Sequence, residues 1–172
     1  KQIHSPRSSF IIYVYFLLKI LKSILPINEN DIEESITALE NTQKIINSKN
    51  LTKTNTSLLL SQQIPDIPLI YYPHGLQAAA IRFKSSLQEN AKSHAITEDV
   101  IESCHNGIVA WEKSSPLQPI LIQGYDDYFK TKERWKILKI FFDKNGIKYH
   151  DVYSINGNIL SKLINLIYRL DY

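Results

Sequence analysis

Residues 69–88, LIYYPHGLQAAAIRFKSSLQ, contain a complete strand–turn–helix unit. Residues 69–72 form a short apolar run, which is typical of strands buried on both faces of a parallel sheet. Pro73 and Gly75 predict a turn, and a helix is expected from Leu76 to about Gln88. Apolar positions recur along this helix at a spacing of three to four residues, and the small alanines among them allow close approach to a sheet. These positions are Leu76, Ala79, Ala80, Phe83 and Leu87.

The same alternation continues toward the C-terminus. Residues 120–122 predict a second buried strand, and a long helix is expected from Asp126 to a C-terminal cap at Gly146. A strand over residues 147–153 and a helix over residues 159–170 complete the pattern. Strands that alternate with helices at these lengths predict a parallel sheet covered by helices. The predicted fold class is therefore α/β, a three-layer α/β/α flavodoxin-like sheet preceded by an α-helical segment.

That preceding segment is expected to contain two helices. Residues 8–25 predict the first, and its uninterrupted apolar run, residues 10–18, falls well short of the roughly 20 residues that cross a bilayer. We therefore expect no membrane association and a helix that is buried on most sides. A capping box of Asn30 and Glu33 predicts a second helix. Residues 52–57 resemble a phosphate-binding Ser/Thr loop, but a linker that caps a short helix is the favoured interpretation.

Composition excludes several classes of function. The 20 basic and 17 acidic residues give a net charge of +3, which is too balanced to indicate nucleic-acid binding. Cys104 is the single cysteine, so the chain has no internal disulfide and no cysteine-based zinc motif. A cytoplasmic location is expected. Cys104 and His105 are sequence neighbours whose side chains point in different directions, which argues against a nucleophile–base pair.

Two groups that move protons near neutral pH, Glu89 and His105, lie sixteen positions apart between apolar elements. A glutamate and a histidine in one loop region are more often structural than catalytic, so the pair alone is a weak signal. Glu89 follows the predicted helix and therefore falls at its C-terminal end. The residues around both groups carry more information than the pair itself.

Three motifs surround these groups: Arg82-Phe83-Lys84, then Gln88-Glu89-Asn90-Ala91-Lys92, then His105-Asn106-x-Ile108-Val109-x-Trp111-Glu112. Together they resemble the second sugar-isomerase (SIS) domain of the bifunctional phosphoglucose/phosphomannose isomerases, found largely in archaea. That family's motifs run roughly RFK, NENAK and HNEIVGWE, with a similar Glu–His spacing. This chain departs from these motifs at three positions. Gln88 replaces an asparagine, Gly107 replaces an acidic residue, and Ala110 replaces a glycine.

The resemblance implies an enzyme that interconverts glucose 6-phosphate or mannose 6-phosphate with fructose 6-phosphate. It implies that Glu89 is the general base, that His105 opens the sugar ring, and that Arg7 faces the intermediate. A second interpretation, given equal weight, is that Arg7 is an exposed arginine at the start of a helix. No metal or organic cofactor is expected. Because the family's histidine reaches the partner subunit's site, a homodimer is expected.

The resemblance also predicts the organisation of the chain. Residues 1–67 are expected to be the end of a first SIS domain plus linker helices. Residues 68–172 are expected to be a second SIS domain that is incomplete at its C-terminus, which makes the chain a fragment. Two alternatives remain: a non-catalytic SIS module for sugar-phosphate binding or dimerisation, favoured by Gly107 and Ala110, and a structural domain whose Glu89 and His105 are ordinary caps.

Overall fold

The computed structural model describes residues 6–64 and 67–172, with side chains from Ser9 onward. Four parallel strands form one sheet in the order β2-β1-β3-β4. The strands are β1 (Pro68–Tyr72), β2 (Ile96–Asp99), β3 (Gln118–Gln123) and β4 (His150–Tyr153). Because all four are parallel, their carboxyl ends meet at one edge of the sheet, which we call the carboxyl edge; the opposite edge is the amino edge.

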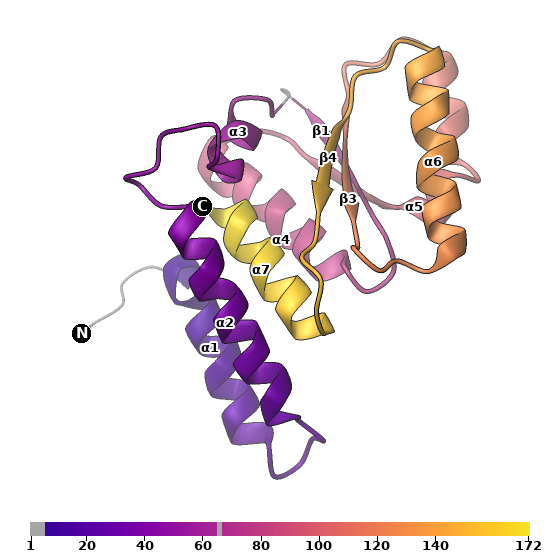
Figure 1. The fold of residues 1–172 in the computed structure, drawn as a ribbon. Coiled ribbons are helices and arrows are strands. Elements are labelled where there is room, and N and C mark those ends of the chain that lie inside the picture. The colour runs from indigo at the N-terminus through magenta and orange to yellow at the C-terminus, as the bar shows by residue number, and fades with distance from the viewer. Residues whose placement is uncertain (1–5, 65–66) are drawn as a thin grey trace.

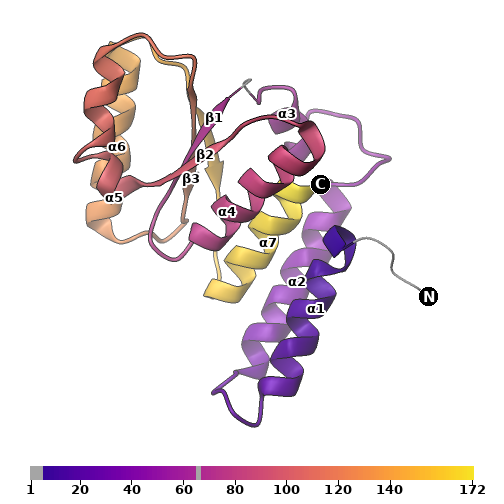
Figure 2. The same cartoon turned by 180° about the vertical axis from the view of Figure 1, so that it is seen from behind.

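Helices cover both faces of the sheet (Figures 1 and 2). One face carries α4 (Gln77–Ser86) and α7 (Ile159–Asp171), and the other carries α5 (Val100–Ser103) and α6 (Phe129–Lys144). Outside α7 lie α1 (Pro6–Leu21) and α2 (Glu29–Ile45), and the short helix α3 (Thr56–Ser61) follows them. Two further turns are η1, a π-helical turn (Leu87–Ala91), and η2, a 3-10 helix (Gly107–Glu112). The predicted three-layer fold class is confirmed.

Alternating side chains of the strands build two separate cores. Ile70 of β1 faces α4 and α7, whereas Tyr71 faces α5 and α6. All five apolar positions predicted for the α4 region are buried in the first core. Phe142 of α6 is the centre of the second core and contacts the rings of Tyr71, Trp111, Phe141 and Tyr149.

The sequence interpretation missed strand β2. Its four residues read Ile-Thr-Glu-Asp and include no buried side chain, because β2 is an edge strand that pairs only with β1. Such a strand lacks the apolar run that marks its neighbours. Other boundaries moved by a few residues: α2 is capped by Asn28 rather than by Asn30, and β4 begins at His150 rather than at residue 147.

The expectation that the first helix is buried on most sides is wrong for this chain. One side of α1 packs through Phe10 against the first core, and Tyr15 shares a hydrogen bond of 2.7 Å with Ser35 of α2. The opposite side exposes more than half of each large apolar side chain, namely Ile12, Tyr13, Phe16, Leu17 and Ile20. We call this set the α1 stripe. Among the described helices, none is long and apolar enough to span a bilayer.

Polar contacts join the N-terminal helices to α7. The Asn158 backbone N–H donates to Glu34 of α2 at 2.8 Å, and the Ser57 hydroxyl donates to the Arg169 carbonyl oxygen at 2.7 Å. The helical segment therefore packs directly on the sheet domain. The boundary at residue 67 stays a prediction.

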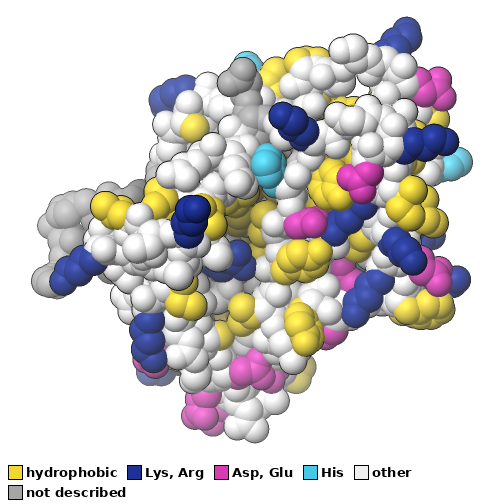
Figure 3. Space-filling model, turned by 45° about the horizontal axis from the view of Figure 1, so that its top comes forward, with side chains coloured by type: hydrophobic (Ala, Val, Ile, Leu, Met, Phe, Trp, Pro, Cys, Tyr) yellow, Lys and Arg dark blue, Asp and Glu magenta, His cyan; other side chains and the backbone are white. Residues whose placement is uncertain are grey.

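Charges of both signs are mixed on the surface. On the face drawn in Figure 3, the Lys and Arg side chains are interspersed with Asp, Glu and apolar side chains. Some of these charges neutralise each other directly, as Lys130 and Glu133 do on α6 at 2.9 Å. On that face the basic side chains are therefore not gathered in one broad patch.

Candidate functional site

Glu89 lies where the backbone leaves regular helical geometry. The α-helix α4 widens into the π-helical turn η1, in which the backbone N–H of Lys92 donates to the carbonyl oxygen of Leu87. Lys92 itself adopts a left-handed conformation with φ of 57°, the one positive φ of a non-glycine residue in the described ranges. Both features are uncommon and occur often at functional sites. The turn leaves the Glu89 side chain exposed at the amino edge.

The Lys92 ammonium group folds back onto this turn and donates to the Glu89 carbonyl oxygen at 2.7 Å. The Glu89 carboxylate has no hydrogen-bond or ion-pair partner within residues 6–64 and 67–172. An open groove of about 640 Å³ runs beside the turn. Its lining consists of Ser61, Ile64, Ile67, Leu87, Ala91, Lys92, Ser93 and His94.

His105 lies at the other end of the sheet. It follows β2 and the short helix α5, whose N-cap Asp99 accepts a hydrogen bond from the Ile101 backbone N–H at 2.7 Å. The His105 backbone N–H donates to Glu102, and its imidazole is exposed with no partner in the described part of the chain. The next residues form η2, and Trp111 fixes it to the sheet by donating to the Tyr71 hydroxyl at 3.0 Å.

The structure therefore does not bring Glu89 and His105 together within one chain. Glu89 precedes β2 at the amino edge, and His105 follows β2 at the carboxyl edge. Four strand residues alone separate these edges by about 13 Å at about 3.3 Å per residue. Arg7 lies in the first turn of α1, and its side chain is outside the described residues.

The arginine of the first motif has a structural role. Arg82 contacts the Asp171 carboxylate through Nε at 2.9 Å and through Nη2 at 2.8 Å, and Ser86 donates to the same carboxylate. Its guanidinium group also lies 4.6 Å from the centre of the Phe10 ring. These contacts tie α4 to α7 and α1, so they hold the helix that carries Glu89.

Gly107, which stands in place of the family's acidic residue, lies beside the Glu98 side chain. A Cβ atom at this position would lie 2.6 Å from Oε1 of Glu98, so the Glu98 carboxylate fills the space beside it. Burial raises the pKa of Glu98, and the neighbouring charge of Glu102 raises it further. A second carboxylate at position 107 would meet charge repulsion from Glu98, whereas the Glu98 carboxylate, at the end of a flexible side chain, can shift to make room for a Cβ atom.

We expect Glu98→Gln to stabilise the domain at pH 7, by less than about 1 kcal/mol because the group is largely solvated. The pKa of Glu98 is higher in the folded state than in the unfolded state, so protonation of Glu98 favours folding. Ionised Glu98 therefore lowers the free energy of unfolding above the folded-state pKa, and this destabilisation disappears as the pH falls. Urea unfolding should therefore show a gain at pH 7 that shrinks toward pH 4. An equal gain at both pH values would contradict charge burial as its cause.

The sequence interpretation also missed a basic cluster on α6. Lys132, Lys136 and Lys139 recur at helical spacing and line one cavity at the carboxyl edge. Their spacing in the sequence was the available signal. Within the described ranges, no three His, Cys, Asp or Glu side chains are grouped so that they could hold a metal ion.

Solved structures with the same fold place this domain in the class of α/β domains built on a parallel sheet. A glucose-6-phosphate isomerase like protein from Thermus thermophilus superposes with a TM-score of 0.66 at 18% identity, over 83% of this chain and 49% of that one. A putative sugar-phosphate isomerase from Listeria monocytogenes gives a TM-score of 0.54 at 12% identity, over 83% of this chain and 82% of that one. The C-terminal domain of a Francisella tularensis glucosamine-fructose-6-phosphate aminotransferase gives a TM-score of 0.53 at 12% identity, over 83% of this chain and 41% of that one.

This chain belongs to the family of the bacterial phospho-glucose isomerase C-terminal SIS domain, whose sequence profile matches residues 53–172. The family resemblance drawn from the three motifs is thereby confirmed. The chain spans about half the length of the Thermus protein. No protein with a curated description matches the sequence.

Proposed function

We propose that this chain is part of a sugar-phosphate isomerase that interconverts glucose 6-phosphate or mannose 6-phosphate with fructose 6-phosphate. Membership of the phosphoglucose isomerase C-terminal domain family supports this proposal. The observation that carries it is the position of Glu89, an exposed carboxylate without a partner in the described part of the chain, on a π-helical turn beside an open groove. The complete enzyme is proposed to contain a first SIS domain as well.

In this proposal Glu89 acts on the open-chain sugar. Its carboxylate removes the proton from C2 of the aldose, and the electron pair of that C–H bond forms the C1–C2 double bond of an enediolate. Return of the proton to C1, with transfer of the O2 hydroxyl proton to O1, moves the carbonyl group to C2 and yields the ketose. His105 exchanges the proton of the ring oxygen and the anomeric hydroxyl during ring opening, and Arg7 provides a cation for the enediolate.

The separation of the two side chains supports a site shared between subunits. Since one chain holds Glu89 and His105 at opposite edges of its sheet, we propose that His105 of one subunit serves Glu89 of the other in a two-fold homodimer. The exposed α1 stripe supports a subunit contact, because contiguous apolar surface of this kind is typical of interaction sites.

Co-expression of two inactive variants tests the shared site. Glu89→Gln subunits and His105→Ala subunits, produced together as the complete protein, should form hybrid dimers in which one of the two sites has both native side chains. Random pairing should then restore about a quarter of the wild-type rate. Each variant expressed alone is the control and should stay inactive.

Two results would contradict parts of this proposal. Hybrid dimers without recovered activity would show that the residues of one chain must work together. Full activity of both variants alone would show that neither Glu89 nor His105 is needed for the reaction. No isomerase activity of the wild-type complete protein would favour the alternative of a non-catalytic module for sugar-phosphate binding or dimerisation. The departures at Gly107 and Ala110 are the observations that favour this alternative.

A further inference from the structure

The π-helical turn η1 is held by side chains of the same motif that contains Glu89. The side-chain amide of Asn90 donates to the Ser86 carbonyl oxygen at 2.8 Å. The Lys92 ammonium group donates to the Glu89 carbonyl oxygen at 2.7 Å. The last carbonyl groups of a helix have no partner inside the helix, so side chains, caps or water must satisfy them. In η1 the motif itself supplies two of these donors.

The rest of the domain anchors the same turn. Leu87 is buried in the first core, and its carbonyl oxygen accepts from the backbone N–H groups of Lys92 and Ser93. Ser86, the last residue of α4, donates its hydroxyl to the Asp171 carboxylate at the end of α7. The turn is therefore joined both to the core and to a neighbouring helix, and it is a fixed support for the side chains that project from it.

Lys92 adopts a backbone conformation that is unfavourable for a residue with a Cβ atom. Its φ of 57° lies in the left-handed region. Glycine is the usual residue at such a helix end, and Gly146 with φ of 67° follows α6 in this way. A lysine at the end of η1 carries a conformational cost that glycine would avoid. The hydrogen bond from its ammonium group to the Glu89 carbonyl oxygen is a contribution that offsets this cost.

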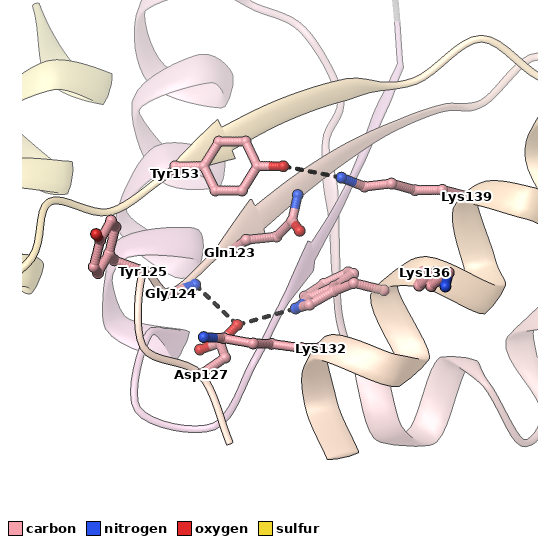
Figure 4. Close-up of a pocket in the computed structure, with 9 residues that line it drawn as sticks. Gln123, Gly124, Tyr125, Asp127, Lys132, Lys136, Lys139 and Tyr153 are labelled. Carbon is pink, nitrogen blue, oxygen red and sulfur yellow. Dashed lines mark hydrogen bonds between the residues drawn. The ribbon is translucent and has the colours of Figure 1, made fainter. Parts of the chain in front are cut away.

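The Lys92 ammonium group also leaves the Glu89 carboxylate free. It bonds the backbone carbonyl of Glu89 and not the carboxylate, which has no partner in the ranges that the structure describes. Asp127 at the carboxyl edge shows the contrast: its Oδ2 accepts from the Gly124 backbone N–H at 2.9 Å and from Nε1 of Trp135 at 3.0 Å (Figure 4). A carboxylate held in that way has a structural role, whereas a general base must reach the proton that it removes.

We propose that Lys92 and Asn90 are positioning residues for the general base. Their hydrogen bonds to the carbonyl oxygens of Glu89 and Ser86 fix the backbone from which the Glu89 side chain projects. Lys92 does so without forming an ion pair with the carboxylate. This inference rests on the proposed role of Glu89 as the base. Such placement matters for the rate, because a displacement of about 1 Å can slow a reaction about 100-fold.

Two substitutions of Lys92 in the complete protein separate positioning from stability. Lys92→Gly relieves the left-handed backbone and removes the ammonium group. It should melt within about 2 °C of the wild type or above it, while kcat falls about 10–100-fold. Lys92→Met keeps an unbranched side chain without a donor, and its kcat should fall equally. KM should stay within about twofold in both variants, since the substrate phosphate is held elsewhere in the proposed site.

Three further variants complete the series. Lys92→Arg keeps a long cationic donor and should retain at least about a third of the wild-type kcat. Asn90→Ala removes the second donor and should lower kcat about tenfold. Gly146→Lys is the matched control, because it places a lysine in the same backbone conformation where nothing lies within 4 Å of the added Cβ atom. This control should melt about 2–4 °C lower with an unchanged kcat.

Hydrogen exchange followed by mass spectrometry gives a measurement that does not depend on turnover. In Lys92→Met the amides of residues 92 and 93, which bond the Leu87 carbonyl oxygen, should exchange at least about tenfold faster than in the wild type. Unchanged exchange in this variant overturns the positioning role. A native kcat of Lys92→Gly beside an inactive Glu89→Gln enzyme also overturns it, and leaves Glu89 as the base. Near-native kcat of Glu89→Gln overturns both inferences.

Discussion

Replacing Glu89 by glutamine is expected to lower kcat of the complete enzyme by about 10²–10⁴-fold, the usual contribution of positioned proton transfer. Glutamine keeps the size and hydrogen-bonding capacity of the side chain but cannot accept a proton. Because the Glu89 carboxylate has no protein partner in the described ranges, the substitution removes no visible structural contact. KM should change little, since the substrate phosphate is held elsewhere in the proposed site.

Two measurements separate this effect from a general loss of structure. Exchange of the substrate C2 proton with solvent should be lost together with turnover, while the melting temperature should stay within about 2 °C of the wild type. Glu40→Gln, an exposed glutamate on α2, is the control and should leave both quantities unchanged. A Glu89→Gln enzyme with near-native kcat would show that another group is the base.

Phe142→Ala is expected to have the largest effect on stability, a loss of about 3–5 kcal/mol. The Phe142 side chain is 0% exposed, and its ring lies 5.5 Å from that of Trp111 and 5.8 Å from that of Tyr149. Alanine leaves a cavity between α6 and the sheet that surrounding rings fill only in part. Since Trp111 also fixes η2, this change should loosen the segment that follows His105.

Urea unfolding measures the loss, and the same helix offers a matched control. Phe129 is 55% exposed, so Phe129→Ala should cost less than about 0.5 kcal/mol. The m-value of Phe142→Ala should stay close to that of the wild type, because the two proteins expose similar surface on unfolding. Equal stability of the two variants would contradict the central role of Phe142 in the second core.

The sequence alone predicted the elements with strong apolar patterns. The α4 region and β1 follow from residues 69–88, because a buried strand and a helix with a continuous apolar face each leave a periodic signal. The edge strand β2 leaves no such signal. Its backbone pairs with β1 on one side only, and its side chains are not buried, so they can be polar. The motifs around Glu89 and His105 identified the family, which its sequence profile confirmed.

Only the tertiary structure decided how these residues are arranged. The resemblance implied that His105 serves the partner subunit's site, but the sequence did not show where the two side chains lie in one chain. Strand β2 runs between Glu89 and His105 and carries them to opposite edges of the sheet. Likewise, Arg82 belongs to a motif, yet only folding shows that it holds Asp171 from a helix 89 positions away. Local patterns fix local structure because they act over a few residues; which side chains share a site depends on contacts that form only when the whole sheet and its helices are assembled.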